Sequence, residues 1–251
     1  MKFKAAAFIA IALLAATSPS ANAVALTSNA AGQELAAQLR NAPPSQGSEV
    51  SGVLKITFGT NRVEIPVRAQ AITEDDKWKT IYTTSSVKNI PAMQIVVIHS
   101  SNAPNQYSYA RATDTNSVFQ KPIVINSQVA AETSLAGSDF TIADLGMDFL
   151  HWPEQIRLTA TPRLGRDCYL LESRNPAAKE MVRVKSWIDK ESEGVGLLVA
   201  EGYNAKDEKV KVFSLSGSSF KKVNGRMQLE KMTIRSPKKS SETVLQFDLQ
   251  K

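Results

Sequence analysis

The sequence predicts a mainly β domain of the α+β class, with one N-terminal helix, about ten or eleven strands and a short helical insert. The first observation behind this is a series of short runs in which apolar and polar residues alternate, as in half-buried strands. The second is the turn-like composition of the links, such as NAKDE, VNGR and PKKSSE. The third is that no C-terminal link has the dozen or more residues of a helical crossover, so that half is expected to form an antiparallel meander.

The first 23 residues have the composition of an export signal. Lys2 and Lys4 precede the apolar run AAAFIAIALLAA, and the small residues Ala21 and Ala23 follow it. A basic start, an apolar centre and small residues at the end are typical of a secretory signal peptide. The alternative is a membrane anchor, but a run of about a dozen apolar residues is shorter than the roughly 20 needed to span a bilayer. We expect cleavage after Ala23, which leaves residues 24–251 as a single exported domain.

The segment NAAGQELAAQLRNAPP predicts the N-terminal helix. Ala31, Leu35 and Leu39 recur every four residues and form one apolar stripe on such a helix. Pro43–Pro44 must end it, because proline has no amide hydrogen to continue the hydrogen-bonded ladder.

Beyond this helix the apolar period changes to two, which predicts a hairpin over residues 51–69. Leu54, Ile56 and Phe58 alternate with polar residues before the turn GTN, and the same alternation resumes after it. Pro66 argues that the second strand is an edge strand or is bulged there. Nine further strand segments follow: KWKTIYTTS, MQIVVIHS, YSYARAT, CYLLES, VRVKSWID, LLVAEGY, KVKVFSL, MQLEKMTIRS and TVLQFDL.

The segment GSDFTIADLGMDFLHWP, residues 137–153, interrupts the strands with a short capped helix. Thr141 and Asp144 have the spacing of a capping box, in which each side chain satisfies a free amide at the helix start. Phe140 and Leu145 have the positions of a hydrophobic staple. Gly146 suits a left-handed exit from the helix.

This insert carries more apolar surface than so short a helix can bury by itself. Phe149, Leu150 and Trp152 follow the capped turn before Pro153 prevents further helix. We therefore expect the insert to pack its aromatic residues against the strands.

The sequence offers little catalytic chemistry. His99 and His151 are the only histidines, and neither has the spacing of a metal-binding motif. There is no G-x-S-x-G, P-loop or G-x-G-x-x-G motif. His151 could be an acid or base beside Trp152, but a surface or packing histidine at the end of the insert is the preferred interpretation. Cys168 is the only cysteine, so no intramolecular disulfide forms, and we expect it to be buried in a strand. We predict no catalytic residue, metal site or cofactor.

The charge is modest and uneven. The formal net charge of +6 falls to +4 without the two lysines of the signal segment, and residues 179–251 hold 15 Lys and Arg against 10 Asp and Glu. Interspersed charges of this kind are typical of a solvated surface. Nucleic acid is not expected as a partner of an exported protein, whereas an anionic membrane or an acidic partner remains open.

From residue 134 onward the chain resembles a known family. The segments GSDFTIADL and DFLHWP, then GRDCYLLESRNP, then VRVKSWIDKESEGVGLLVAEGYNAKDEKVKVFSL, and the closing FKKVNGRMQLEKMTIRSPKKSSETVLQFDL resemble the outer-membrane lipoprotein-sorting protein family. This family is similar to the periplasmic lipoprotein carriers LolA and LolB. The resemblance implies a curved, half-open antiparallel β-barrel with helices over its open side, and acyl chains bound in the apolar space between them.

On this resemblance residues 140–152 form part of a lid over the curved sheet. In the carriers an arginine near the first strands helps to hold the lid; Arg62 and Arg68 are nearby, although neither lies in a matching motif. The alternative for each apolar residue is ordinary core. The predicted lipid-binding residues are Leu54, Ile56, Phe58, Phe140, Leu145, Phe149, Trp152, Leu245 and Phe247.

The resemblance implies a non-enzymatic periplasmic carrier that shuttles a lipidated protein or a lipid towards the outer membrane. Its expected partners are that cargo, an inner-membrane transporter and an outer-membrane acceptor, with transient membrane contact and a monomeric state. The alternative is a sensor or adaptor domain of the same fold that binds a protein partner and regulates envelope signalling. A third and less favoured hypothesis is an enzyme of the same fold whose active site lies in the cavity.

Overall fold

The computed structural model describes residues 21–42, 49–74, 77–100, 103–113, 118–191, 196–215, 219–223 and 226–249. Most of the predicted signal segment, residues 1–20, lies outside these ranges, and cleavage after Ala23 stays a prediction. In the ranges that are described, no helix has both the length and the apolar character needed to cross a membrane.

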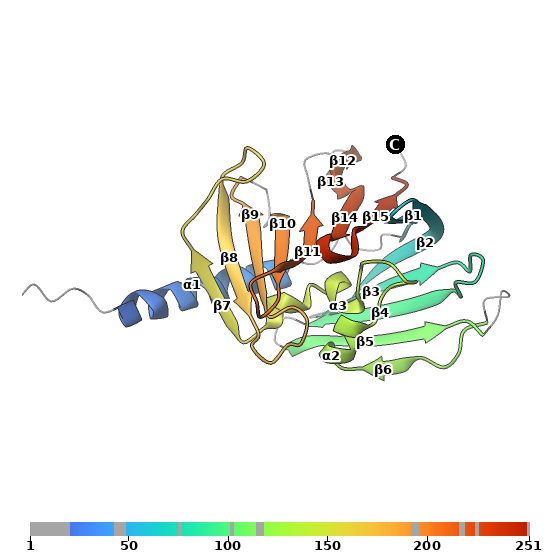
Figure 1. Cartoon of the computed structure of the whole chain (residues 1–251), viewed down its shortest axis with the longest axis horizontal. Coiled ribbons are helices and arrows are strands. Elements are labelled where there is room, and N and C mark those ends of the chain that lie inside the picture. Colours follow the sequence, from blue (N-terminus) through green and yellow to red (C-terminus); the bar gives the residue numbers. More distant parts are fainter. Residues whose placement is uncertain are drawn as a thin grey trace, which may run out of the picture.

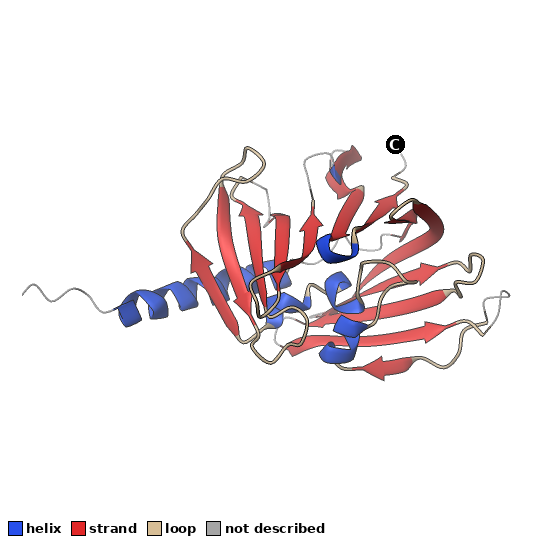
Figure 2. Ribbon diagram, viewed as in Figure 1, coloured by secondary structure: helices blue, strands red, loops and turns tan. Residues whose placement is uncertain are grey.

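Thirteen antiparallel strands form one sheet in the described part of the chain, and its two ends do not meet (Figures 1 and 2). The strand order is β6-β5-β4-β3-β2-β1-β15-β14-β11-β10-β9-β8-β7. The N-terminal arm consists of β1 (Glu49–Phe58), β2 (Asn61–Glu74), β3 (Lys77–Thr84), β4 (Met93–Ser100), β5 (Ala103–Arg111) and β6 (Ile123–Ile125). The C-terminal arm consists of β7 (Glu154–Leu158), β8 (Cys168–Arg174), β9 (Arg183–Asp189), β10 (Gly196–Tyr203), β11 (Lys209–Ser214), β14 (Lys231–Ser236) and β15 (Ser241–Phe247).

The two arms meet at the pair β1–β15, where Leu54 lies opposite Leu245. A separate hairpin is formed by β12 (Phe220–Val223) and β13 (Arg226–Leu229). The predicted class, mainly antiparallel β with few helices and an unclosed sheet, is confirmed. The predicted number of strands was too low, because β6, β7 and β12 are short and because β13 and β14 are separate strands.

The helices are α1 (Ala21–Arg40), α2 (Ser127–Glu132), α3 (Ile142–Leu145) and the 3-10 turns η1 (Asp148–His151) and η3 (Pro237–Lys239). We call residues 127–151 the helical insert. In chain order it joins β6 to β7, the two free edges of the sheet, and in Figure 1 it lies between the two arms. We call the face of the sheet that carries the insert the inner face.

The insert takes part in two apolar clusters on the inner face. Phe140, Ile142 and Leu145 are buried in the first, with residues of β1–β5, β14 and β15. Phe149 and Leu150 are buried in the second, with residues of α1 and β8–β10. The insert therefore packs against both arms, and this explains why so short a segment contains so many apolar residues.

Helix α1 lies on the C-terminal arm through the predicted stripe. Leu35 and Leu39 are buried in the second cluster, whereas Ala31 is half-buried. Gly32 brings the helix against β7, since a Cβ atom at this position would lie 2.2 Å from the backbone oxygen of Gln155. The close contact of helix and strand therefore requires a residue without a side chain at position 32.

Pro66 lies in neither a bulge nor an edge strand, so that expectation was wrong. Strand β2 is an interior strand, and its pairing with β1 is continuous through Pro66 and Val53. The carbonyl of Pro66 accepts a hydrogen bond from Ser85 at 2.9 Å, and the β2–β3 ladder begins one residue later at Val67. In a strand the amide and the carbonyl of one residue point to the same neighbouring strand, so the amide hydrogen that Pro66 lacks would have faced β3. The missing hydrogen bond therefore falls at the end of the β2–β3 ladder, where it interrupts no pairing.

Candidate functional site

The structure places most of the predicted lipid-binding residues in the two apolar clusters, on the sheet or on the helical insert itself. Those of the first apolar cluster are Leu54, Phe140, Leu145, Leu245 and Phe247, with Ile56 partly buried against it. Phe149 lies in the second cluster and Trp152 is partly buried against it. Phe58 is 58% exposed at the end of β1. The apolar side chains of the insert occupy the space between the arms, and a lipid-binding role for all nine residues stays a prediction.

The start of α3 is fixed by the predicted capping box. Thr141 Oγ1 accepts from the amide of Asp144 at 3.2 Å, and Asp144 Oδ2 accepts from the amide of Thr141 at 2.8 Å. The same carboxylate also receives Lys211 Nζ of β11 at 2.6 Å, and both side chains are largely buried. Asp144 therefore both caps the helix and attaches it to the C-terminal arm.

The N-terminal arm holds the insert through two polar side chains of β5. Asn105 Nδ2 donates to the carbonyl of Gly146 at 2.7 Å, and Tyr107 Oη donates to Asp148 Oδ1 at 2.8 Å. Ser127 Oγ, at the start of α2, donates to the same oxygen of Asp148 at 3.1 Å. Burial and the nearby Asp148 raise the pKa of Tyr107, which keeps its hydroxyl a donor.

Gly146 is needed for close packing and not for the left-handed exit that its sequence position predicted. Its φ is −91°, and the left-handed conformation falls on Met147, with a φ of 48°. A Cβ atom at position 146 would lie 2.7 Å from Tyr107 Oη and 3.0 Å from Asn105 Nδ2. The glycine lets β5 approach the insert.

A third attachment comes from β15. Asp139, just before α3, accepts from Ser241 Oγ at 2.6 Å and from Thr243 Oγ1 at 3.0 Å. Polar contacts thus surround the apolar underside of the insert.

The arginine that holds the insert is Arg40, the last residue of α1. Its Nη1 donates to the carbonyl of Leu150 at 2.5 Å. The two arginines near the first strands, neither of which lies in a matching motif, lie elsewhere: Arg62 is exposed, and Arg68 pairs with Glu49 at 3.3 Å. A cation in the last helical turn was visible in the sequence, but its partner 110 positions away was not.

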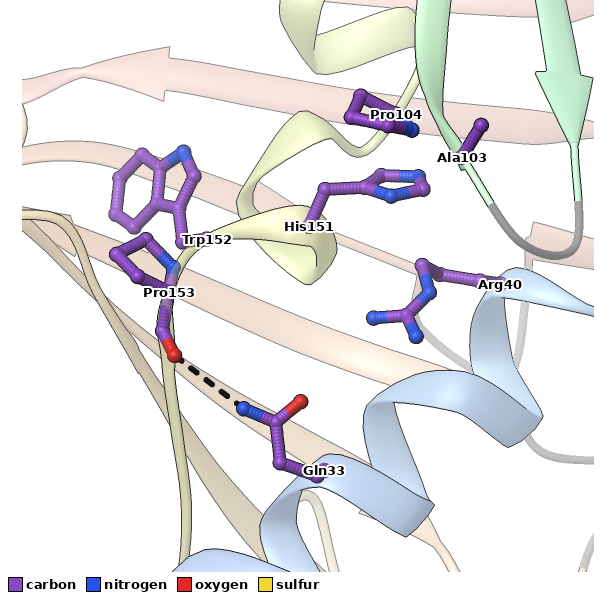
Figure 3. Close-up of a pocket in the computed structure, with 7 residues that line it drawn as sticks. All are labelled: Gln33, Arg40, Ala103, Pro104, His151, Trp152 and Pro153. Atoms are coloured by element: carbon purple, nitrogen blue, oxygen red, sulfur yellow. Dashed lines mark hydrogen bonds between the residues drawn. The ribbon is translucent and has the colours of Figure 1, made fainter.

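A surface pocket of about 390 Å³ opens beside this arginine (Figure 3). It lies between the end of α1, the start of β5 and the end of the insert. Gln33 Nε2 donates to the carbonyl of Pro153 at 3.3 Å across one side of it. Its lining residues are Gln33, Arg40, Ala103, Pro104, His151, Trp152 and Pro153.

Both histidines lie near this pocket in environments that disfavour their charged forms. His99 stacks on Trp78, with ring centroids 4.9 Å apart. Burial, helped by repulsion from His151, lowers the pKa of His99 to about 4. Burial and Arg40 lower the pKa of His151, against the attraction of Asp148. Both imidazoles are therefore neutral at pH 7.

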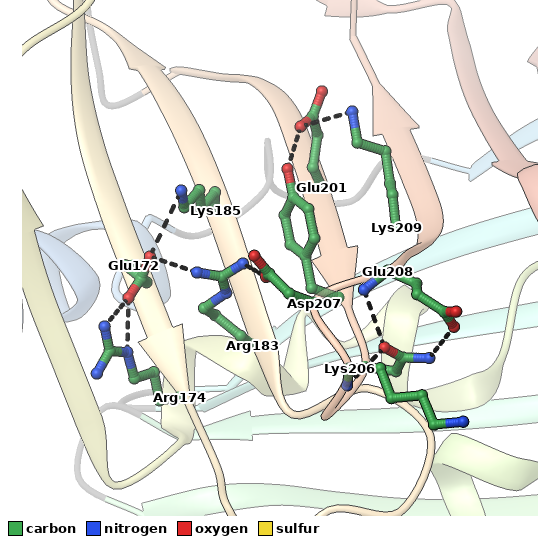
Figure 4. A network of polar contacts seen from close by, with 11 residues as sticks. Glu172, Arg174, Arg183, Lys185, Glu201, Lys206, Asp207, Glu208 and Lys209 are labelled. Atoms are coloured by element: carbon green, nitrogen blue, oxygen red, sulfur yellow. Dashed lines mark hydrogen bonds and ion pairs between the residues drawn. The ribbon is translucent and has the colours of Figure 1, made fainter.

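On the outer face of the C-terminal arm, basic residues surround buried carboxylates (Figure 4). Glu172, 2% exposed at its side chain, pairs with Arg174, Arg183 and Lys185. Glu201 accepts from Tyr203 Oη at 2.6 Å and pairs with Lys209 and Arg163. Several basic residues of this arm therefore neutralise buried carboxylates of the same arm and do not form a free basic surface.

The described residues contain no group of three or more His, Cys, Asp or Glu side chains arranged to hold a metal. Cys168 is buried, and burial raises the pKa of its thiol, so it lacks the thiolate character of a reactive cysteine.

The comparisons with known proteins agree with this architecture. A family model with the description "Uncharacterized protein" matches residues 74–250. No curated protein matches the sequence. A DUF1329 family protein from Desulfovibrio piger has a TM-score of 0.67 at 20% identity, over 88% of this chain and 91% of that chain. A putative outer membrane lipoprotein-sorting protein domain from Vibrio parahaemolyticus has a TM-score of 0.67 at 15% identity, over 88% and 92%.

A LolA superfamily protein from Nitrosomonas europaea has a TM-score of 0.56 at 13% identity, over 87% of this chain and 91% of that chain. At these identities the likeness concerns the fold. The resemblance drawn from the sequence is confirmed at that level, since the chain has the fold of DUF1329 and LolA-superfamily proteins.

Proposed function

The chain belongs to the family whose model matches residues 74–250, and from its fold we propose that it is a periplasmic carrier of acyl chains. The acyl chains of a lipoprotein or lipid would bind between the helical insert and the inner face of the sheet. The carrier would deliver them towards the outer membrane. No chemical step is needed for this role, and we propose a non-enzymatic protein.

The observation that carries the proposal is how the insert is attached. Its underside is apolar and buried, whereas its connections to the sheet are separate polar contacts through Asp139, Asp144 and Asp148. An insert held in this way can leave the sheet when a ligand supplies the lost apolar contacts. Each buried methylene group of such a ligand contributes about 0.8 kcal/mol.

The proposed function also implies which cargo and partners the protein meets. Its cargo would be a lipidated protein or a lipid, received from an inner-membrane transporter and passed to an outer-membrane acceptor after transient membrane contact. We expect it to act as a monomer and not to bind nucleic acid.

Export is tested by N-terminal sequencing of the protein recovered from its own periplasm. We expect the first residue to be Val24, because the small residues Ala21 and Ala23 precede it. A chain that keeps Met1 and stays in the membrane fraction would contradict the proposed signal peptide.

Acyl binding is tested with a variant that keeps Trp152 as its only tryptophan, through Trp78→Phe and Trp187→Phe. Dihexanoylglycerol, a neutral diacyl compound, is expected to shift the Trp152 emission as the insert moves. Lys211→Met removes the cation from Asp144 and is expected to tighten acyl binding about tenfold, because opening the insert then costs less.

Lys209→Met is the matched control for this test, since Lys209 lies on the same strand but pairs with Glu201. We expect it to leave acyl binding unchanged. If Trp152 emission does not respond to any diacyl compound in the folded protein, and Lys211→Met only lowers the melting temperature, the insert is ordinary core and the proposal fails.

A further inference from the structure

The pocket beside Arg40 differs in chemistry from the apolar core. The described residues that line it supply a guanidinium, an imidazole, an indole, an amide and two prolines, and none of them is acidic. The sequence also has no acidic residue between Arg40 and Glu49. At about 390 Å³ the pocket lies at the small end of the roughly 300–1,000 Å³ typical of ligand sites.

Arg40 is a half-buried cation that pairs with no carboxylate among the described residues. Its one hydrogen bond to a described residue goes to the carbonyl of Leu150, which uses only part of the guanidinium fork. Burial lowers the pKa of Arg40, but a guanidinium remains charged in proteins. In Figure 3 the guanidinium lies between His151 and Gln33 and points into the pocket. This charge is available to an anion that enters.

His151 is placed to respond to the same anion. Among the described residues, the charged groups that act on it are Arg40, which opposes its protonation, and Asp148, which favours it; the neutral His99 is also close enough to interact with it. An anion beside Arg40 would cancel the repulsion from the guanidinium. His151 would then take up a proton and become a second cation for the ligand.

We propose that this pocket binds the phosphodiester group of an anionic amphiphile whose acyl chains enter the neighbouring apolar core. The fork of Arg40 matches two phosphate oxygens, and Trp152 and Pro153 offer an apolar wall to the glycerol part. The acyl half of this inference rests on the proposed function, but the anion site does not.

Arg40 also gives the pocket a link to the helical insert. The guanidinium that would hold the phosphate is the group that holds the Leu150 carbonyl. A phosphodiester competes well with a neutral carbonyl, because its full negative charge attracts the guanidinium and two of its oxygens can accept from the fork at once. Binding of the headgroup would therefore release the end of the insert.

The test compares three probes by calorimetry: dihexanoyl-phosphatidylglycerol, dihexanoylglycerol, which lacks the phosphate, and inorganic phosphate, which lacks the chains. We expect the phospholipid to bind about ten- to a hundredfold more tightly than dihexanoylglycerol. Arg40→Gln, which keeps a donor for Leu150, should remove this ratio. Arg62→Gln, on the exposed part of β2, should preserve it.

Several results would overturn the inference. Equal affinities for phospholipid and dihexanoylglycerol in the natural chain would rule out the phosphate site and leave the proposed function standing. Inorganic phosphate that binds as tightly as the phospholipid would assign the pocket to the free ion. If neither acyl compound binds, the proposed function fails, and the anion site is then judged by whether phosphate shifts the His151 ring signals in NMR spectra; unchanged signals overturn it.

The pH dependence gives a second readout. The phosphodiester keeps one negative charge between pH 7.5 and 5.5, so any change in affinity comes from the protein. We expect the affinity to rise as the pH falls, because the bound anion raises the pKa of His151. His151→Gln should flatten this dependence while the Arg40 effect persists. A flat profile in the natural chain would remove His151 from the site.

Discussion

Lowering the pH from 7 to 4 is expected to reduce the free energy of unfolding by about 3 kcal/mol through His99 alone. The pKa of His99 is about 4 in the folded protein, mainly because of burial, against an ordinary value of 6.5. Between these two values the unfolded chain binds a proton that the folded chain does not. Stability is therefore lost as the pH falls through 6.5, and His151, whose pKa is also lowered, acts in the same direction.

The measurement is urea unfolding at pH 7, 5.5 and 4 for the natural chain and for His99→Phe. Phenylalanine keeps an aromatic ring to stack on Trp78 but does not titrate. The variant lacks the His99 contribution, so its free energy of unfolding is expected to fall by about 3 kcal/mol less than that of the natural chain between pH 7 and pH 4. Equal pH dependence in both proteins would mean that His99 is protonated as readily in the folded state as in the unfolded one.

Gly32→Ala is expected to destabilise the protein by about 1–3 kcal/mol, the usual cost of overpacking. On an exposed helix the same change is favourable by about 1 kcal/mol, because alanine is the better helix former. Here the added Cβ would meet the backbone oxygen of Gln155 at 2.2 Å and the amide of Arg157 at 2.7 Å. Backbone atoms of β7 cannot rotate away, so α1 must shift and expose part of Leu35 and Leu39.

Thermal unfolding checks the sign of this effect, with Gln38→Ala on the exposed side of α1 as control. The control should change stability by no more than about 0.5 kcal/mol. A Gly32→Ala protein more stable than the natural chain would show that α1 does not pack on β7 as closely as described. Arg40 lies on the same helix, so a shifted α1 should also weaken the bond to Leu150.

Features formed by residues close together in the sequence were predicted well, whereas contacts between residues far apart in the sequence were not. The capping box of Thr141 and Asp144 lies within four residues, so the sequence alone determines its geometry. The attachments of the insert join residues 41, 67 and 104 positions apart, through Gly146, Lys211 and Thr243. Such partners depend on strand order and register, which alternation alone does not specify.

Gly146 illustrates the limit of local reasoning. A glycine four residues into a short helix is typical of a helix exit, yet the reason for it is the approach of Tyr107 from a distant strand. Short strands were missed because of their length: the Ile-Val-Ile of β6 favours a strand, but three residues are too few to show an alternating pattern, and pairing with β5 defines the strand.

The pairing of β1 with β15 also constrains how the chain folds. Most neighbouring strands within each arm are also consecutive in the chain, so they pair as hairpins that form quickly; the exception is β11–β14, since β12 and β13 lie between these strands in the chain. The centre of the sheet joins residues 52–58 to residues 241–247, so closing it costs the entropy of a loop of almost the whole domain. Until then β1 and β15, the innermost strands of the two arms, are exposed edges that pair readily with other chains. A chaperone that holds the emerging chain until β15 is free would thus protect it from aggregation.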